Sequence, residues 1–356
     1  MKIMQNTHYF SIILFSTIML SLLINCTEAT PDPKPIPKIE KVVETCEKDK
    51  IQHAKLINVA QAFDLLDTPD HFFIEVSKKS EYNKGHLANA INVWRPEFRT
   101  KLDIPYTGMR SSGKELISFL QNIGMDSETS MIIYDTKGGS DAFRLAWVLD
   151  YYGFENYKVI NGGKKSWAIA GYPLSTKQRT IEKNKDFTFA YKENKNILAT
   201  HEEVLNAIRD TNYIIIDTRE DYEYLGQCFV HQGEVLSYKK GAFDRGCIPN
   251  AIHFNWSNMS DLTNDHRIKC LKDLKFDLAQ KAISKNKNII VYCQSGSRSS
   301  HTAFVLKEIL EYPNVKNYDG SWIEWSYLSK QNKTPIQKLT SEEDFETQRQ
   351  LFSTSL

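Results

Sequence analysis

Apolar and polar positions follow a pattern that predicts buried strands separated by amphipathic helices. The clearest apolar run covers residues 289–292, within "IIVYCQSGSRSSHTAFVL", and is typical of a strand buried on both faces. Beyond it, apolar residues recur at helical spacing, at Ala303, Leu306 and Leu310. Ser299 or Ser300 is expected to cap this helix. Cys293 should therefore lie at the carboxyl end of a central strand, where ligands bind in open α/β sheets.

The same pattern occurs twice along the chain. "MIIYDTKGGSDAFRLAWVL" at 131–149 aligns with the stretch around Cys293, and Asp135 takes the position of the cysteine. Upstream, "FIEVSKKSEYNKGHLANAINV" aligns with "IIDTREDYEY…RGCIPNAIHF", where the second copy holds an insertion at about residues 225–245. A repeat of this length indicates two domains rather than a solenoid. Strand and helix alternate in each copy, which predicts a parallel sheet with helices on both faces.

This pattern divides the folded part of the chain into four segments. The first copy is expected at 52–176 and the second at 197–332. Residues 177–196 are polar and charged and are interpreted as the linker. Residues 333–356 form a C-terminal tail.

The N-terminus resembles an export signal. The stretch 9–24 is apolar apart from Ser and Thr, and it ends in "SLLINC", which resembles the bacterial lipobox. Residues 1–25 are predicted to be a signal peptide, and the proline-rich stretch 26–51 a flexible tether. Cys26 would carry the lipid anchor and hold the protein in the cell envelope, facing the periplasm or on the outer membrane. An uncleaved anchor, a secreted form and an incidental apolar start remain as alternatives.

Composition excludes some classes of function. The 45 basic and 44 acidic residues give a formal charge of +1, and no long basic run with interleaved aromatics predicts nucleic-acid binding. No spacing of His and Cys predicts a metal site, and we expect no cofactor. Besides Cys26 there are five cysteines, so one thiol has no partner within the chain. A Cys228–Cys247 disulfide stays open, although cysteines this close in sequence are more often unpaired.

The motifs around Cys293 resemble those of the rhodanese sulfurtransferases. These motifs are C-x-x-G-x-R after a buried strand, "YDGSWIEW" after it and "DTR…GCIPNAIHF" before it. The tandem arrangement, over about 52–332, is similar to thiosulfate and 3-mercaptopyruvate sulfurtransferases, whose second domain carries the cysteine. The resemblance implies an α/β fold with two rhodanese-like domains, each a five-stranded parallel sheet with helices on both faces. It also implies sulfur transfer from thiosulfate, or alternatively 3-mercaptopyruvate, through a persulfide on Cys293.

Three departures leave the donor open. Cys247 stands where the family's "GHI" pattern usually has histidine, and Glu223 stands where tandem thiosulfate enzymes often place a substrate-binding arginine. The loop "CQSGSR" matches neither the "CRKGVT" pattern of thiosulfate enzymes nor the "CGSGVT" pattern of mercaptopyruvate enzymes.

The loop after Cys293 has the residue types that activate a thiol. A short loop between strand and helix directs backbone N–H groups inward, and the helix N-terminus adds positive potential, so a thiolate is stabilised. Gly296 permits a positive φ, and Arg298 supplies a cation for an anionic donor. The predicted donor-binding loop comprises Gln294, Ser295, Gly296, Ser297 and Arg298. The acceptor would be a thiol or cyanide.

Other residues near the motifs are interpreted as supporting or structural. Asp217 and Arg219 are expected to form an ion pair that braces the site. Trp322 and Trp325 are expected in the core. The cations of the insertion are interpreted as solvated surface charges: Lys239, Lys240 and Arg245.

The first copy is predicted to be inactive. Asp135 cannot accept sulfane sulfur, and its carboxylate should occupy its own loop of N–H groups. The first domain would then serve to wall the cleft of the second. Two rival functions remain: a non-enzymatic persulfide carrier or envelope binding module, and a cysteine phosphatase. Phosphatases of related fold place five residues between Cys and Arg, whereas four lie between Cys293 and Arg298.

Overall fold

The computed structural model describes residues 51–354. The predicted signal peptide (1–25), the lipidation site Cys26 and all of the tether except residue 51 lie outside the described residues. Among the helices that are described, none is long and apolar enough to cross a membrane.

The first domain is built on a five-stranded parallel sheet with the strand order β1-β5-β4-β2-β3. The strands are β1 (Leu56–Ile57), β2 (His71–Val76), β3 (Ile91–Val93), β4 (Ser130–Asp135) and β5 (Tyr157–Ile160). The helices are α1 (Val59–Asp64), α2 (Lys79–Asn83), η2 (Arg95–Phe98), α3 (Gly113–Asn122), α4 (Ala142–Tyr151) and α5 (Gly163–Ile169).

The second domain repeats this sheet with the order β10-β7-β11-β12-β6, which is the same succession of equivalent strands. The strands are β6 (Leu198–Ala199), β7 (Tyr213–Asp217), β10 (Ile252–His253), β11 (Asn288–Tyr292) and β12 (Val315–Tyr318). The helices are η3 (Lys195–Ile197), α6 (His201–Ala207), α7 (Asp221–Leu225), η4 (Trp256–Met259), α8 (Leu271–Gln280), α9 (Ser297–Phe304), the π-helical turn η5 (Val305–Ile309) and α10 (Ser321–Lys330). The predicted α/β fold with two parallel sheets is confirmed.

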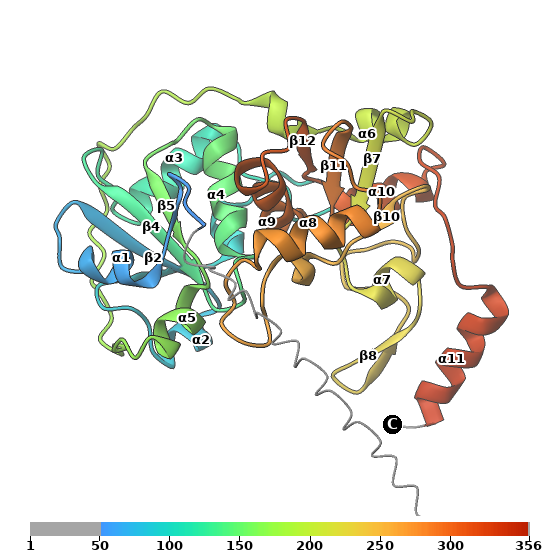
Figure 1. Cartoon of the computed structure of the whole chain (residues 1–356), viewed down its shortest axis with the longest axis horizontal. Coiled ribbons are helices and arrows are strands. Elements are labelled where there is room, and N and C mark those ends of the chain that lie inside the picture. Colours follow the sequence, from blue (N-terminus) through green and yellow to red (C-terminus); the bar gives the residue numbers. More distant parts are fainter. Residues whose placement is uncertain (1–50, 355–356) are drawn as a thin grey trace, which may run out of the picture. The chain divides into compact units, whose positions relative to one another are not determined.

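Alternation along the central strands places side chains in separate cores. In β11, Ile289 and Val291 face a core that both domains share, whereas Ile290 and Tyr292 face a core belonging to the second domain alone. Helices α4 and α9 pack together in the shared core, as Figure 1 shows between the two sheets. The rings of Phe143 and Phe304 meet there at 4.5 Å. Helix α9, which follows Cys293, is thus buried against the first domain.

The insertion and the C-terminal tail pack together beside the second sheet. The insertion contains an antiparallel hairpin, β8 (Phe229–His231) and β9 (Glu234–Leu236), and the tail contains α11 (Glu342–Thr354), which lies near the hairpin in Figure 1. Arg245 forms a 2.6 Å ion pair with Glu342 and lies 3.8 Å above the Phe345 ring. Interpreting Arg245 as a solvated charge was therefore wrong, since its side chain is only 6% exposed.

Candidate functional site

Cys293 lies where the sequence places it, directly after β11 and before α9. Its backbone N–H donates to the Ser321 hydroxyl at 3.2 Å. Two amides at the start of α10, those of Trp322 and Ile323, donate to the carbonyls of Cys293 and Gln294. These hydrogen bonds hold the loop against α10. Cys293 itself is buried, with only 1% of its surface exposed.

The surroundings of Cys293 favour its thiolate. Burial alone would raise the pKa of the Cys293 thiol, because a buried charge loses its hydration. The charge of Arg298, the nearby Ser299 hydroxyl and the amides of Ser299 and Ser295 act in the opposite direction. They outweigh burial, so the pKa of Cys293 is lowered from its ordinary value. A thiolate held in this way is the nucleophilic form of cysteine.

Gly296 makes the tight turn that starts the helix. It adopts a φ of 79° and is the N-cap of α9. A Cβ there would lie 2.7 Å from Arg144 Nη1 and 2.9 Å from the Asp319 carbonyl, so glycine is required for space as well as conformation. The prediction that Ser299 or Ser300 caps the helix was wrong. Both lie inside α9, and the Ser300 hydroxyl donates back to the Gly296 carbonyl.

The side chains of the loop differ in whether they have partners. Gln294 Nε2 and Ser297 Oγ are buried with no hydrogen-bond partner among the described residues. Gln294 also lines a small space beneath the insertion, together with Glu223, Lys239 and Trp322. That space measures about 10 Å³, about what a single water molecule needs.

Arg298 is held by acidic residues of α7 and its N-cap. Its two terminal nitrogens donate to the two carboxylate oxygens of Glu223, at 2.6 and 3.0 Å, and one also lies 3.3 Å from Glu220. Glu223 in turn accepts from Lys239 of the insertion at 2.8 Å. Burial would raise the pKa of Glu223, but Arg298 and Lys239 hold it well below its usual range. Glu223 therefore stays ionised.

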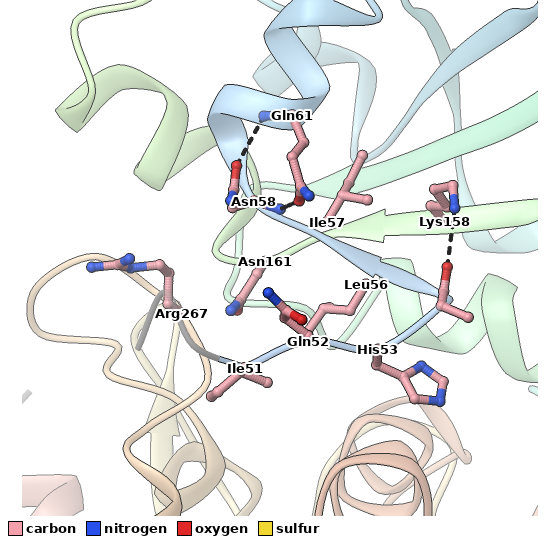
Figure 2. Close-up of a pocket in the computed structure, with 11 residues that line it drawn as sticks. Ile51, Gln52, His53, Leu56, Ile57, Asn58, Gln61, Lys158, Asn161 and Arg267 are labelled. Atoms are coloured by element: carbon pink, nitrogen blue, oxygen red, sulfur yellow. Dashed lines mark hydrogen bonds between the residues drawn. The ribbon is translucent and has the colours of Figure 1, made fainter. Parts of the chain in front are cut away.

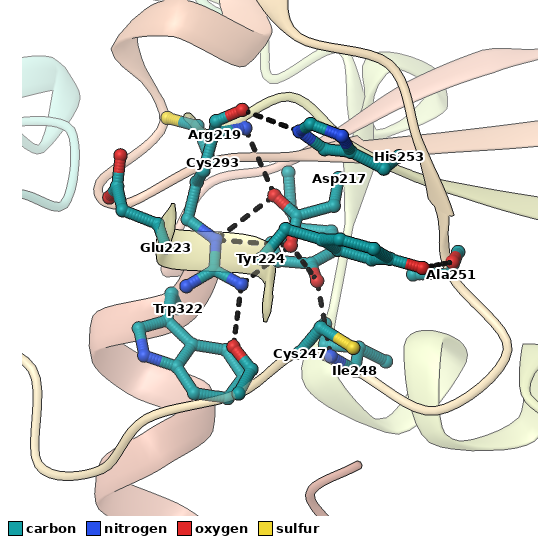
Figure 3. A network of polar contacts seen from close by, with 12 residues as sticks. Asp217, Arg219, Glu223, Tyr224, Cys247, Ile248, Ala251, His253, Cys293 and Trp322 are labelled. Carbon is teal, nitrogen blue, oxygen red and sulfur yellow. Dashed lines mark hydrogen bonds and ion pairs between the residues drawn. The ribbon is translucent and has the colours of Figure 1, made fainter. Parts of the chain in front are cut away.

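Asp217 and Arg219 form the predicted ion pair below the loop (Figure 3). Arg219 Nη2 lies 2.6 Å from the Asp217 carboxylate and donates to the Gly246 carbonyl at 2.7 Å. Its guanidinium lies 4.4 Å from the Trp322 ring, and the Tyr292 hydroxyl donates to Asp217. All four side chains are buried, so the pair is a structural brace.

Cys247 shows that burial by itself does not activate a thiol here. Burial and the nearby charge of Asp217 raise the pKa of Cys247 to about 12. Its thiol contacts the Gln337 carbonyl at 3.7 Å instead of a loop of amides. Cys247 and Cys293 are free thiols, so the open Cys228–Cys247 disulfide is not formed, whereas Cys270 is disulfide-bonded.

The first domain contributes a buried cation behind the loop. Arg144 of α4 is fully buried, and its Nη2 donates to Asp319 at 2.5 Å and to the Gly108 carbonyl at 3.0 Å. Arg110 also reaches Asp319, at 3.1 Å. A Cβ on Gly108 would lie 2.8 Å from Ser295 Cβ, so this stretch of the first domain packs directly on the loop. The expected packing of the first domain against the second is therefore present at this loop.

The equivalent loop of the first domain is filled by its own side chain. The Asp135 carboxylate accepts from four backbone amides at 2.8–3.1 Å, those of Lys137, Gly139, Asp141 and Ala142. The prediction that this carboxylate occupies the loop is confirmed. It also shows that the loop geometry binds an anion.

A larger cavity lies away from this site, at the N-terminal edge of the first sheet (Figure 2). It measures about 540 Å³ and lies between β1, the residues just before it and Arg267. Among the described residues, its lining includes His53, Lys158 and Asn161 but no cysteine or carboxylate. Within residues 51–354, no group of three or more His, Cys, Asp or Glu side chains could hold a metal ion.

Sequence reasoning missed the partners that hold the loop from a distance. Glu223 was noted as a departure from a family pattern, but its pairing with Arg298 was not foreseen. Arg144, Asp319 and the Ser299 hydroxyl were not singled out. The run of acidic residues in "REDYEY" was the one signal that could have suggested a partner for Arg298.

Comparison with known proteins agrees with this geometry. The Rhodanese-like domain model matches twice, at residues 58–170 and 200–327. The thiosulfate sulfurtransferase of Azotobacter vinelandii is 30% identical over 261 residues, 73% of this chain and 89% of its own length. The sulfur carrier protein TtuD of Thermus thermophilus is 30% identical over 251 residues, 69% of this chain and 84% of its own.

Solved structures give the same fold. The anaerobic ergothioneine biosynthesis enzyme from Chlorobium limicola aligns with a TM-score of 0.67 over 81% of this chain and 71% of its own. Its sequence is 21% identical, so this likeness concerns the fold alone.

Proposed function

The chain belongs to the rhodanese family of sulfurtransferases, and on that premise we propose that it transfers sulfane sulfur through a persulfide on Cys293. The candidate donors are thiosulfate or a related sulfur compound, with 3-mercaptopyruvate as the alternative. The acceptor is a thiol or cyanide. The support from relatives is the match to a thiosulfate sulfurtransferase over most of both chains.

The proposed reaction has two balanced halves. The Cys293 thiolate attacks the outer sulfur of thiosulfate, the bond between the two donor sulfurs breaks, and sulfite leaves with the electron pair. A thiophilic acceptor then attacks the outer sulfur of the persulfide and restores the thiolate. The loop amides and Arg298 stabilise the anionic sulfur throughout.

One observation carries this proposal: Cys293 is a buried thiol whose pKa is lowered, at the centre of an amide-lined loop. The direct test is intact-protein mass spectrometry after incubation with each donor. We expect a gain of about 32 Da, one sulfur atom, that maps to the peptide containing Cys293. Loading on another cysteine, or on none, would contradict the proposal.

A non-enzymatic carrier is the second candidate, and the relative named as a sulfur carrier supports it. Multiple turnovers of thiosulfate with cyanide distinguish the two functions. An enzyme forms many thiocyanates per chain, whereas a carrier would load one sulfur and wait for its specific partner. The phosphatase alternative is disfavoured by the loop itself, because four residues lie between Cys293 and Arg298 where phosphatases of related fold place five.

We also propose that the protein is exported and lipid-anchored through Cys26. The support is the apolar segment, the "SLLINC" junction and the proline-rich tether. The disulfide at Cys270 is in keeping with an oxidising compartment.

A further inference from the structure

We infer that Glu223 sets the class of sulfur donor, by disfavouring the dianion thiosulfate relative to persulfides with an uncharged body. This inference rests on the proposed function of Cys293. It concerns which donor reaches the thiolate, and leaves the transfer itself unchanged.

Glu223 is connected to the Cys293 site through Arg298. Its carboxylate bonds to both terminal nitrogens of Arg298, the cation that also acts on the Cys293 thiol. Its side chain is only 4% exposed, so solvent screens its charge poorly. A donor that approaches Cys293 therefore meets the field of a buried carboxylate along with that of Arg298.

The charges around Arg298 cancel. Arg298 and Lys239 carry two positive charges, and Glu220 and Glu223 carry two negative ones within ion-pair distance of them. Arg219, beside the loop, is neutralised by Asp217, and Arg144 and Arg110 behind the loop share the single carboxylate of Asp319. Among the described residues of the Arg298 cluster, no cation is left unpaired for a second negative charge on the donor. The thiosulfate dianion is therefore poorly compensated on the Arg298 side of the loop.

A persulfide donor needs less compensating positive charge than thiosulfate does. Its terminal sulfur carries at most one negative charge, and the loop that serves the thiolate also suits that sulfur. Attack by Cys293 transfers the terminal sulfur, breaks the S–S bond of the donor and releases the donor's thiolate. The unpartnered Gln294 Nε2 and Ser297 Oγ supply neutral donors for that leaving sulfur.

The test compares two donors in wild type and in Glu223→Gln, which keeps the shape and one acceptor oxygen. The donors are thiosulfate and N-acetylcysteamine persulfide, whose body is neutral. We expect the ratio of their kcat/KM values, thiosulfate over persulfide, to rise roughly tenfold in Glu223→Gln. Because a change in the pKa of Cys293 affects both donors, the ratio isolates discrimination from thiol activation.

Three further variants make the result specific. Glu81→Gln changes the equivalent position of the first domain, which pairs with Lys84, and should leave the ratio unchanged. Glu220→Gln removes a more exposed charge near Arg298 and should give a smaller rise. Lys239→Met removes a cation from the exposed insertion and should lower the ratio, which tests the charge argument even if Glu223→Gln folds poorly.

Two outcomes distinguish the inference from its premise. If wild type gains 32 Da on Cys293 but the ratio is unchanged in Glu223→Gln and in Lys239→Met, Glu223 does not select the donor. If neither donor loads Cys293 in wild type, the proposed function fails, and this inference fails with it.

Discussion

At the scale of the residue, two buried cysteines in one domain differ in what surrounds the sulfur. Cys293 faces amides and Arg298, so its pKa is lowered, whereas Cys247 faces Asp217, so its pKa is raised to about 12. We predict that Cys293→Ser abolishes sulfur transfer and leaves the fold intact, because serine fills the space without a nucleophilic thiolate. Cys247→Ser is the matched control, and thiocyanate formation is the measurement. Full turnover in Cys293→Ser would refute the central role of this thiol.

Arg298 should matter through the protonation of Cys293. We predict that Arg298→Ala moves the midpoint of iodoacetamide alkylation of Cys293 to higher pH, because the cation that lowers this pKa is gone. Less thiolate is then present near neutral pH, and kcat/KM should fall by about tenfold or more.

Arg298→Lys keeps the charge and should recover part of both effects. A structural loss alone would not move the alkylation midpoint. If the midpoint stays where it is in Arg298→Ala, Arg298 does not activate the thiol.

The sequence predicted those site residues whose partners are close along the chain. Asp217 and Arg219 are two residues apart, and Asp135 meets amides within its own loop. Glu223 and Arg298 are 75 residues apart, and Arg144 and Asp319 are 175 apart. Nothing in one sequence specifies which distant charges will meet, because that depends on how sheets and helices pack.

At the scale of the element, α9 connects the Cys293 loop to the first domain. His301 of α9 is fully buried, 4.9 Å from the Phe143 ring of α4, and burial lowers its pKa from 6.5 to about 4. The unfolded chain therefore binds a proton below pH 6.5 that the folded chain does not bind until about pH 4. The contribution of His301 to the free energy of unfolding is therefore complete above pH 6.5. It is lost as the pH falls toward 4, and the total loss is about 3 kcal/mol.

We predict that His301→Gln removes this part of the pH dependence of the unfolding free energy. The measurement is urea unfolding at several pH values between 6.5 and 4. His231→Gln, at an exposed position of the hairpin, is the matched control and should keep the slope. An unchanged slope in His301→Gln would show that the acid sensitivity arises elsewhere, for example at other buried groups of the α4–α9 contact.

Strands and helices were predicted where the pattern of apolar residues is strong. Parallel central strands appear as continuous apolar runs, and this signal gave β4 and β11. The cap of α9 was misassigned because the Ser300 hydroxyl bonds back to the Gly296 carbonyl within the helix. Helix α11 was not foreseen, because its sequence is mostly polar and its contacts are to the distant insertion.

At the scale of the whole molecule, the first domain packs against the Cys293 loop of the second domain, while its own equivalent loop is filled by a carboxylate. Asp135 satisfies the anion loop of the first domain, while Arg144 and Arg110 of the same domain bind Asp319 behind the loop of the second. The loop of the first domain is thus filled by the Asp135 carboxylate. The loop of the second domain holds the Cys293 thiol, and beside it lie polar groups that have no hydrogen-bond partner among the described residues.

The remaining prediction concerns where the whole molecule is held. If Cys26 is lipidated, wild-type protein should sediment with membranes and incorporate labelled palmitate, because two or more acyl chains give firm anchoring at about 0.8 kcal/mol per buried methylene. Cys26→Ser should not incorporate the label and should leave the membrane fraction. Thiocyanate formation by both forms is the control, since the site around Cys293 does not include Cys26. Unlabelled wild-type protein with its N-terminus elsewhere would contradict the lipid anchor and leave the sulfurtransferase proposal standing.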